Sequence, residues 1–206
     1  MKRTAYLFLE VIVCIVSCCA CNNYGLRDQL ENPGNGDANF SALKIFVTAS
    51  TYAANLNVVG PDNICRQDLA NPKGVGNGIW RALLGYNTRR ACSTANCGGG
   101  AAENLNWALR PKQNYARPDG TYIGRTNDSS LFVLPLATSF STVPGLKAWS
   151  GLDTNWLNSL VCSDWITTSG ATSGMRAAAD AVTIAAISEA AEICSSSLAL
   201  ICVEQP

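Results

Sequence analysis

Histidine is missing from all 206 residues of the chain. This absence excludes hydrolases that use an imidazole base, zinc sites of the HExxH type and pH switches built on histidine. Charged residues are also scarce, at 15% of the chain against roughly 25% in an average soluble protein. The 15 basic and 15 acidic residues cancel, so net charge gives no reason to expect a nucleic acid partner.

The N-terminal apolar run is too short to cross a membrane as a helix, which takes about 20 residues. It covers residues 5–16, follows Lys2 and Arg3 and is interrupted by Glu10. A short apolar segment behind basic residues is typical of a secretory signal peptide. We therefore expect residues 1–17 to be a signal peptide.

The signal segment ends in a pattern for lipid attachment. The letters IVSC at residues 15–18 resemble a bacterial lipobox, in which branched residues and a small residue precede the lipidated cysteine. They predict lipidation of Cys18, with Cys21 as a second candidate. Residues 18–42 then form a lipidated N-terminus and a flexible, glycine- and proline-containing tether. The alternative is an ordinary signal peptide in which these cysteines are incidental.

Six of the ten cysteines lie beyond the tether, at Cys65, Cys92, Cys97, Cys162, Cys194 and Cys202. An even number in an exported domain predicts disulfides, although six cysteines allow fifteen pairings. Spacing favours only Cys92–Cys97, because the residues between these two can form a tight turn. A zinc cluster is the competing interpretation. It is weakened because the six contain no CxxC pair and the chain offers no histidine.

Runs rich in β-branched and aromatic residues predict strands separated by turns. These runs lie at residues 44–50, 78–86, around Trp107 and at 130–136. Pro118-Asp119-Gly120 predicts a hairpin turn. The closing run, residues 198–203, is rich in branched apolar residues and predicts a buried strand where chains usually fray.

Two segments favour helix. Pro61 and Asp62 suit a first helical turn, which places Cys65 toward the core, and Pro72 ends this short helix. Residues 175–194 are rich in alanine, so we expect them to be partly helical. No internal repeat or second domain is visible, and residues 43–206 are expected to form a single domain.

Positive charge is concentrated locally even though the total is zero. Residues 80–125 hold seven basic side chains against two acidic ones, a local excess of about +5 interleaved with aromatic residues. The basic residues are Arg81, Arg89, Arg90, Arg110, Lys112, Arg117 and Arg125. They predict a basic, aromatic surface that contacts an acidic protein patch or a sulfated sugar. The alternative is that strands distribute these side chains over different faces.

Several motifs, in order, resemble a known family. VCSDWITTSGATSG followed by ICSSSLALICVEQ resembles the C-terminal part of endostatin, the terminal domain of certain collagens. Upstream, KIFVTASTYAANLNVVGPDNICRQDLANPKGVGNGIWRALLG resembles the opening strand, cysteine helix and next strand of that domain. The resemblance is closer to bacterial endostatin-like lipoproteins, typified by the leptospiral endostatin-like outer-membrane proteins, and covers about residues 44–205.

The resemblance implies an α+β fold for residues 43–206. This would be a C-type-lectin-like (endostatin-like) mixed sheet with few short helices, long loops and three disulfides. Cys65 would pair with Cys202 and Cys162 with Cys194. Cys92 and Cys97, which have no counterpart in endostatin, would then pair with each other.

The resemblance also implies a function. Its members suggest a non-enzymatic adhesin that is lipid-anchored in the outer membrane and exposed at the cell surface. It would bind host extracellular-matrix proteins such as laminin and fibronectin and, as some members do, complement factor H. Endostatin binds zinc through histidines, which this chain lacks, so no metal and no cofactor are expected. The sugar-binding calcium motifs of C-type lectins are absent as well. The alternatives are a structural envelope lipoprotein without a host ligand and a carbohydrate-binding module.

Overall fold

The computed structural model describes residues 42–206. The expected signal peptide, lipidation at Cys18 or Cys21, and the tether up to residue 41 lie outside the described residues. No helix within the described part is long and apolar enough to cross a membrane.

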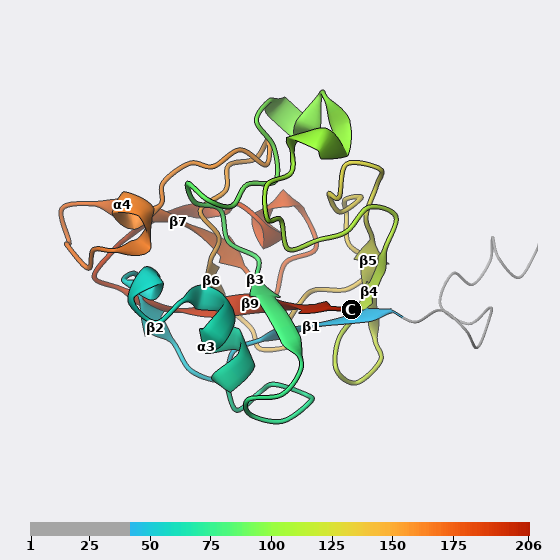
Figure 1. Ribbon diagram of the computed structural model, residues 1–206. Helices are drawn as coiled ribbons and strands as arrows, with labels where there is room; N and C mark the ends of the chain where they lie inside the picture. The colour runs from blue at the N-terminus through green and yellow to red at the C-terminus, as the bar shows by residue number, and fades with distance from the viewer. Residues whose placement is uncertain (1–41) are drawn as a thin grey trace, which may run out of the picture. The chain divides into compact units, whose positions relative to one another are not determined.

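The C-terminal strand β9 (Ser197–Gln205) is the centre of the sheet. It pairs antiparallel with β1 (Leu43–Val47), β2 (Tyr52–Ala53) and β3 (Ile79–Ala82), and parallel with β6 (Lys147–Trp149). Figure 1 shows β9 running through the middle of the domain beside β1. The strand expected at 198–203 is therefore confirmed, and it joins both ends of the domain in one sheet.

The remaining strands extend the sheet on both sides. Along its main path the strand order is β5-β4-β1-β9-β6-β7-β8. On one side β4 (Asn114–Ala116) and β5 (Tyr122–Arg125) form the expected hairpin, with Gly120 at φ 90° in its turn. On the other side lie β7 (Ser173–Ala178) and β8 (Ala190–Ile193).

Helices are few and short among the described residues. The expected helix at Pro61 is α3 (Pro61–Gln67), which starts with the proline and buries Cys65. The others are α4 (Cys162–Trp165) and the 3₁₀ helices η1 (Leu56–Val58), η2 (Ala95–Cys97), η3 (Gly100–Glu103) and η4 (Ile184–Ala186). Together with the mixed sheet they define an α+β fold.

The expected helical character of residues 175–194 is largely wrong. The segment forms most of β7, the single 3₁₀ turn η4 and all of β8. Ala177, Ala178 and Ala179 are buried, so their small side chains serve close packing of the sheet. Tertiary packing here overrides the helix propensity of alanine.

Two expected strands are also missing. Trp107 lies outside any strand, and residues 130–136 contribute only an isolated bridge between Thr126 and Phe132. Residues 130–136 form scattered hydrogen bonds in place of a regular ladder. For example, the backbone N–H of Leu136 donates to the carbonyl of Val182 at 2.7 Å. Leu131, Phe132 and Leu136 are nevertheless buried, because a loop can fill a core without forming a ladder.

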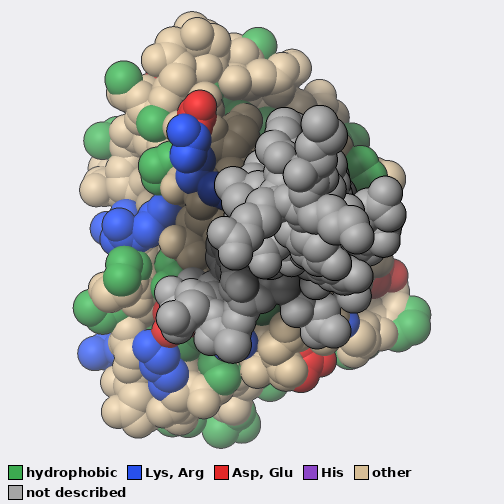
Figure 2. Space-filling model, turned by 90° about the vertical axis from the view of Figure 1, so that its right-hand side faces the viewer, with side chains coloured by type: hydrophobic (Ala, Val, Ile, Leu, Met, Phe, Trp, Pro, Cys, Tyr) green, Lys and Arg blue, Asp and Glu red, His purple; other side chains and the backbone are tan. Residues whose placement is uncertain are grey.

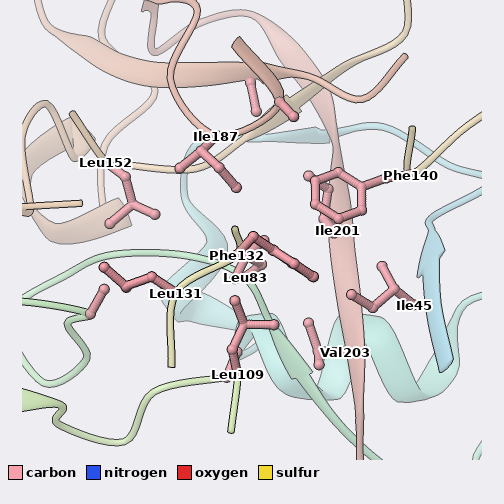
Figure 3. Close-up of a cluster of buried hydrophobic side chains, with 14 of the residues drawn as sticks. Ile45, Leu83, Leu109, Leu131, Phe132, Phe140, Leu152, Ile187, Ile201 and Val203 are labelled. Carbon is pink, nitrogen blue, oxygen red and sulfur yellow. The ribbon is translucent and has the colours of Figure 1, made fainter. Parts of the chain in front are cut away.

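Two apolar clusters lie on opposite faces of β9. Ile201 and Val203 point into one cluster, and Leu200 and Cys202 point into the other, as the alternation of a strand requires. Figure 3 shows Ile201 and Val203 near Ile45, with side chains contributed by loops around them. The C-terminal strand is thus covered on both faces.

Three disulfides secure this arrangement. Cys65–Cys202 joins α3 to β9, Cys162–Cys194 joins α4 to the residue after β8, and Cys92–Cys97 closes a short loop. These are the three pairs that the resemblance implies. The second bridge lies within the sequence span of the first, so the outer bridge encloses most of the domain.

Candidate functional site

The candidate site is an open groove of about 430 Å³ beside the C-terminal end of β9. Its volume falls within the range of roughly 300–1,000 Å³ that is common for ligand pockets. Among residues 42–206, its charged lining residues are two arginines and include no carboxylate. The lining residues are Arg81, Ala101, Asn104, Asn106, Trp107, Leu109, Arg110, Pro111, Ser130 and Gln205.

Strand pairing positions Arg81 and Gln205. Arg81 on β3 lies opposite Val203 of β9, and Ile79 lies opposite Gln205. Side chains alternate along a strand, so Arg81 and Gln205 share the sheet face of Val203. Arg81 Nη1 donates to the carbonyl of Trp107 at 3.0 Å, which holds the guanidinium against the groove wall.

The groove floor is a loop fixed by hydrogen bonds from buried side chains. Gln205 Nε2 donates to Ala108 O at 2.9 Å, and Trp107 Nε1 donates to Ser130 O at 3.1 Å. These bonds satisfy the loop's polar groups although it belongs to no helix or strand.

Arg110 stands at the other side of the groove on an anchored backbone. Its N–H donates to the phenol oxygen of Tyr115 at 2.9 Å, and its carbonyl accepts from the hydroxyl of Thr126. Burial raises the pKa of Tyr115 to about 12, so this phenol stays neutral. The Arg110 side chain itself is exposed.

The loop closed by Cys92–Cys97 supports the segment that lines the groove at Ala101 and Asn104. Glu103 receives five hydrogen bonds from Ser93, Thr94 and Gly99 at its carboxylate. The Thr94 hydroxyl and the backbone N–H groups of Gly99, Thr94 and Ser93 lower the pKa of Glu103 to about 2. The ionised carboxylate therefore organises the segment that leads into Asn104.

The seven basic residues do not form one continuous surface. Arg81 and Arg110 line the groove. Arg89 is 4% exposed and paired with Asp62, so we remove it from the candidate contact residues. Lys112 pairs with Asp128, and Arg117 lies 4.0 Å from Asp119.

The last two members, Arg90 and Arg125, lie outside the groove lining. Arg90 Nε donates to Glu103 O, and Arg125 Nε donates to Lys112 O. Figure 2 shows Lys and Arg side chains in separate groups on one face, with uncharged surface between them. Trp107 and Tyr115 are buried, so the expected aromatic character of the surface is also reduced.

Sequence reasoning missed the amides that share the groove with the arginines. Asn104 and Asn106 lie in an irregular loop, where spacing carries no signal. Gln205 could have been found, because alternation along β9 places it on the face of Ile201 and Val203. Within residues 42–206, no group of three or more Cys, Asp or Glu side chains is arranged to hold a metal ion.

The fold and the groove define a disulfide-stabilised α+β domain with a candidate site for an anionic group. Residues 49–182 match the family described as "Protein of unknown function (DUF1554)". This match covers well over half of the chain, and the chain belongs to that family. No curated protein matches the sequence of this chain. Arg81 and Arg110 lie inside the matched residues, whereas Gln205 lies beyond them.

Proposed function

We propose that this protein is a lipid-anchored, non-enzymatic surface protein whose domain binds host proteins. The observation that carries the proposal is the groove that presents Arg81 and Arg110, with no carboxylate from residues 42–206 in its lining. Arginine is enriched where proteins bind other proteins, and complementary charge speeds their encounter. Laminin, fibronectin and complement factor H are the ligands to test first, on the strength of the resemblance to leptospiral endostatin-like proteins.

The domain is proposed to have a C-type-lectin-like, endostatin-like fold. The pairing of β1 with β9 supports this, since the family brings its first and last strands together. The pairs Cys65–Cys202 and Cys162–Cys194 support it too, because they are the pairs that the resemblance implies. A fold of this kind hosts many functions, so the ligand must be argued from the groove.

The anchor is proposed to be lipid on Cys18 in the outer membrane, with the domain outside the cell. The support is the IVSC motif behind a signal segment. Metabolic labelling with a radioactive fatty acid tests it: label should be lost in Cys18→Ser and kept in Cys14→Ser. Label that persists in Cys18→Ser but is lost in Cys21→Ser would move the anchor to Cys21.

Binding is tested with the full-length protein on immobilised laminin, fibronectin and factor H. Saturable binding at physiological salt supports the proposal, and its absence on all three ligands refutes it. Protease treatment of intact cells then separates an adhesin from a structural envelope lipoprotein. Rapid cleavage of the domain fits surface exposure, whereas complete protection favours the envelope lipoprotein.

A further inference from the structure

The groove concentrates positive charge that no neighbouring acid neutralises. Within residues 42–206, neither Arg81 nor Arg110 forms an ion pair. Arg89 and Lys112, by contrast, each have a carboxylate partner within 2.7 Å. The groove therefore attracts an anion, because its two guanidinium groups lack the counter-charge that other cations of the domain have.

The charge is confined, which limits the size of the anion. Extended polyanions such as nucleic acids gain affinity from many basic contacts along their length. Here the unpaired arginines of the groove are flanked by Lys112, which Asp128 neutralises. A single carboxylate matches this arrangement better, since a guanidinium presents planar donors that suit one carboxylate.

The amides of the groove add hydrogen-bond acceptors. The side-chain nitrogens of Asn104, Asn106 and Gln205 each donate to backbone carbonyls. Within the described residues, the amide oxygens of these three side chains accept no hydrogen bond. A ligand that fits should therefore carry N–H or O–H donors next to its carboxylate.

An exposed apolar side chain stands beside the groove. Ile79 is 63% exposed and lies opposite Gln205 in the pairing of β3 with β9. It is two residues from Arg81, on the same face of β3. An apolar contact next to two arginines is typical of the centre of a protein interface and is not needed to bind a simple sugar acid.

We propose that the groove binds an Asp or Glu side chain on an extended segment of the protein ligand. The carboxylate is bound by Arg81 and Arg110, and backbone N–H groups of the segment donate to the amide oxygens. An apolar side chain two residues along the segment, which lies on the same face as the carboxylate, packs on Ile79. This inference rests on the proposed function, for which it names the chemistry that is recognised.

The test uses the full-length protein and a capped peptide that repeats Glu-Ser-Leu-Ser, which in extended form places Glu and Leu on one face, with its Gln-Ser-Leu-Ser counterpart as the matched probe. Calorimetry should show that the Glu peptide binds more tightly and that added salt weakens it. Arg110→Gln should weaken it by about tenfold or more, the loss expected for a charge-assisted hydrogen bond. Ile79→Ser should weaken both peptides.

Arg66→Gln is the control variant, because it removes the same charge from an exposed site on α3. It should leave the affinity unchanged within about twofold, the range of a screened distant charge. Equal binding by Arg110→Gln, or no Glu-peptide binding at millimolar concentration, overturns the inference. Binding of glucuronate in place of the peptide would assign the groove to a sugar acid instead.

The same variants separate this inference from the proposed function. If wild type and Arg110→Gln bind laminin or fibronectin equally well, host binding stands and the role of the groove fails. If no host protein binds but the Glu peptide binds through Arg110, the groove's specificity stands and the choice of ligand fails.

Discussion

Asp62 at the start of α3 and Arg89 form a two-pronged ion pair, with oxygen–nitrogen distances of 2.7 and 2.6 Å. The Asp62 carboxylate also accepts from the backbone N–H of Ala82, while Arg89 Nη1 donates to Ala82 O at 3.0 Å. The Arg89 side chain is 5% exposed and that of Asp62 is 38% exposed. The pair therefore fastens α3 to the segment that follows β3.

Asp62→Ala should destabilise the domain by about 2–3 kcal/mol, because it leaves the Arg89 charge buried without its partner. Urea unfolding monitored by tryptophan fluorescence measures this. The control is Asp128→Ala, whose partner Lys112 is 66% exposed, and which should change stability by less than about 0.5 kcal/mol. Equal losses in both variants would contradict a structural role for the buried pair.

The sequence predicted the elements that local chemistry determines. Proline at the start of α3, the turn at Pro118-Asp119-Gly120 and the branched residues of β9 each carry a local signal, and each element is present. Residues 175–194 carry a misleading signal, since their alanines favour helix in isolation. The segment forms strands because Ala177 is buried within the sheet, where it lies opposite Ala148 of β6. This pairing depends on residues far away in the chain.

The candidate site was predicted only in part for a similar reason. The local excess of positive charge predicted Arg81 and Arg110 as contact residues, but it predicted Arg89 equally. Only the fold distinguishes them, because Asp62 reaches Arg89 across 27 positions of sequence, whereas no acid of the described part of the chain forms an ion pair with the groove arginines. Alternation along β9 places Gln205 on the face of Val203, but only the pairing of β9 with β3 brings it to the same face as Arg81.

Glu103 should make the stability of the domain depend on acid pH. Its pKa is lowered from 4.5 to about 2 in the fold, so the ionised form is favoured there. The resulting stabilisation is fully present above about pH 4.5, the unfolded value, and is lost as pH falls toward 2. Thermal unfolding should therefore show a smaller loss between pH 5 and 2.5 in Glu103→Gln than in wild type.

Glu103→Gln should already be less stable than wild type at pH 7, since an amide cannot accept all five hydrogen bonds as a carboxylate does. Asp119, Asp180 and Glu192 also have lowered pKa values, so some acid sensitivity should persist in the variant. Parallel melting curves for the two proteins across this pH range would show that Glu103 does not contribute.

The three disulfides should differ in their effect on stability. In the chain-entropy treatment, bridges spanning 137, 32 and 5 residues contribute about 5, about 4 and about 2 kcal/mol. Replacing each pair by alanine should therefore destabilise the domain most for Cys65–Cys202 and least for Cys92–Cys97. Urea unfolding of the three double variants measures the order.

Removing residues 201–206 should have a larger effect than loss of any bridge. The deletion takes away Cys202 and the part of β9 that pairs with β1 and β3. Both apolar clusters then lose central members, so no cooperative transition should remain. An unchanged melting curve for the truncated protein would contradict the central place of β9.

Gly174 should tolerate no side chain, because β7 passes directly over the inner disulfide. A Cβ at this position would lie 2.8 Å from Cys162 Sγ, 3.0 Å from Trp165 and 3.1 Å from Trp149. Gly174→Ala must displace a disulfide or a buried indole, and overpacking of this kind costs about 1–3 kcal/mol. Urea unfolding should show this loss, and near-UV circular dichroism should report the displaced tryptophans. Gly170→Ala is the matched control, since its nearest neighbour is Ser195 Oγ at 3.5 Å. A Gly174→Ala protein as stable as the control would mean that the strand can move away from the tryptophan pair.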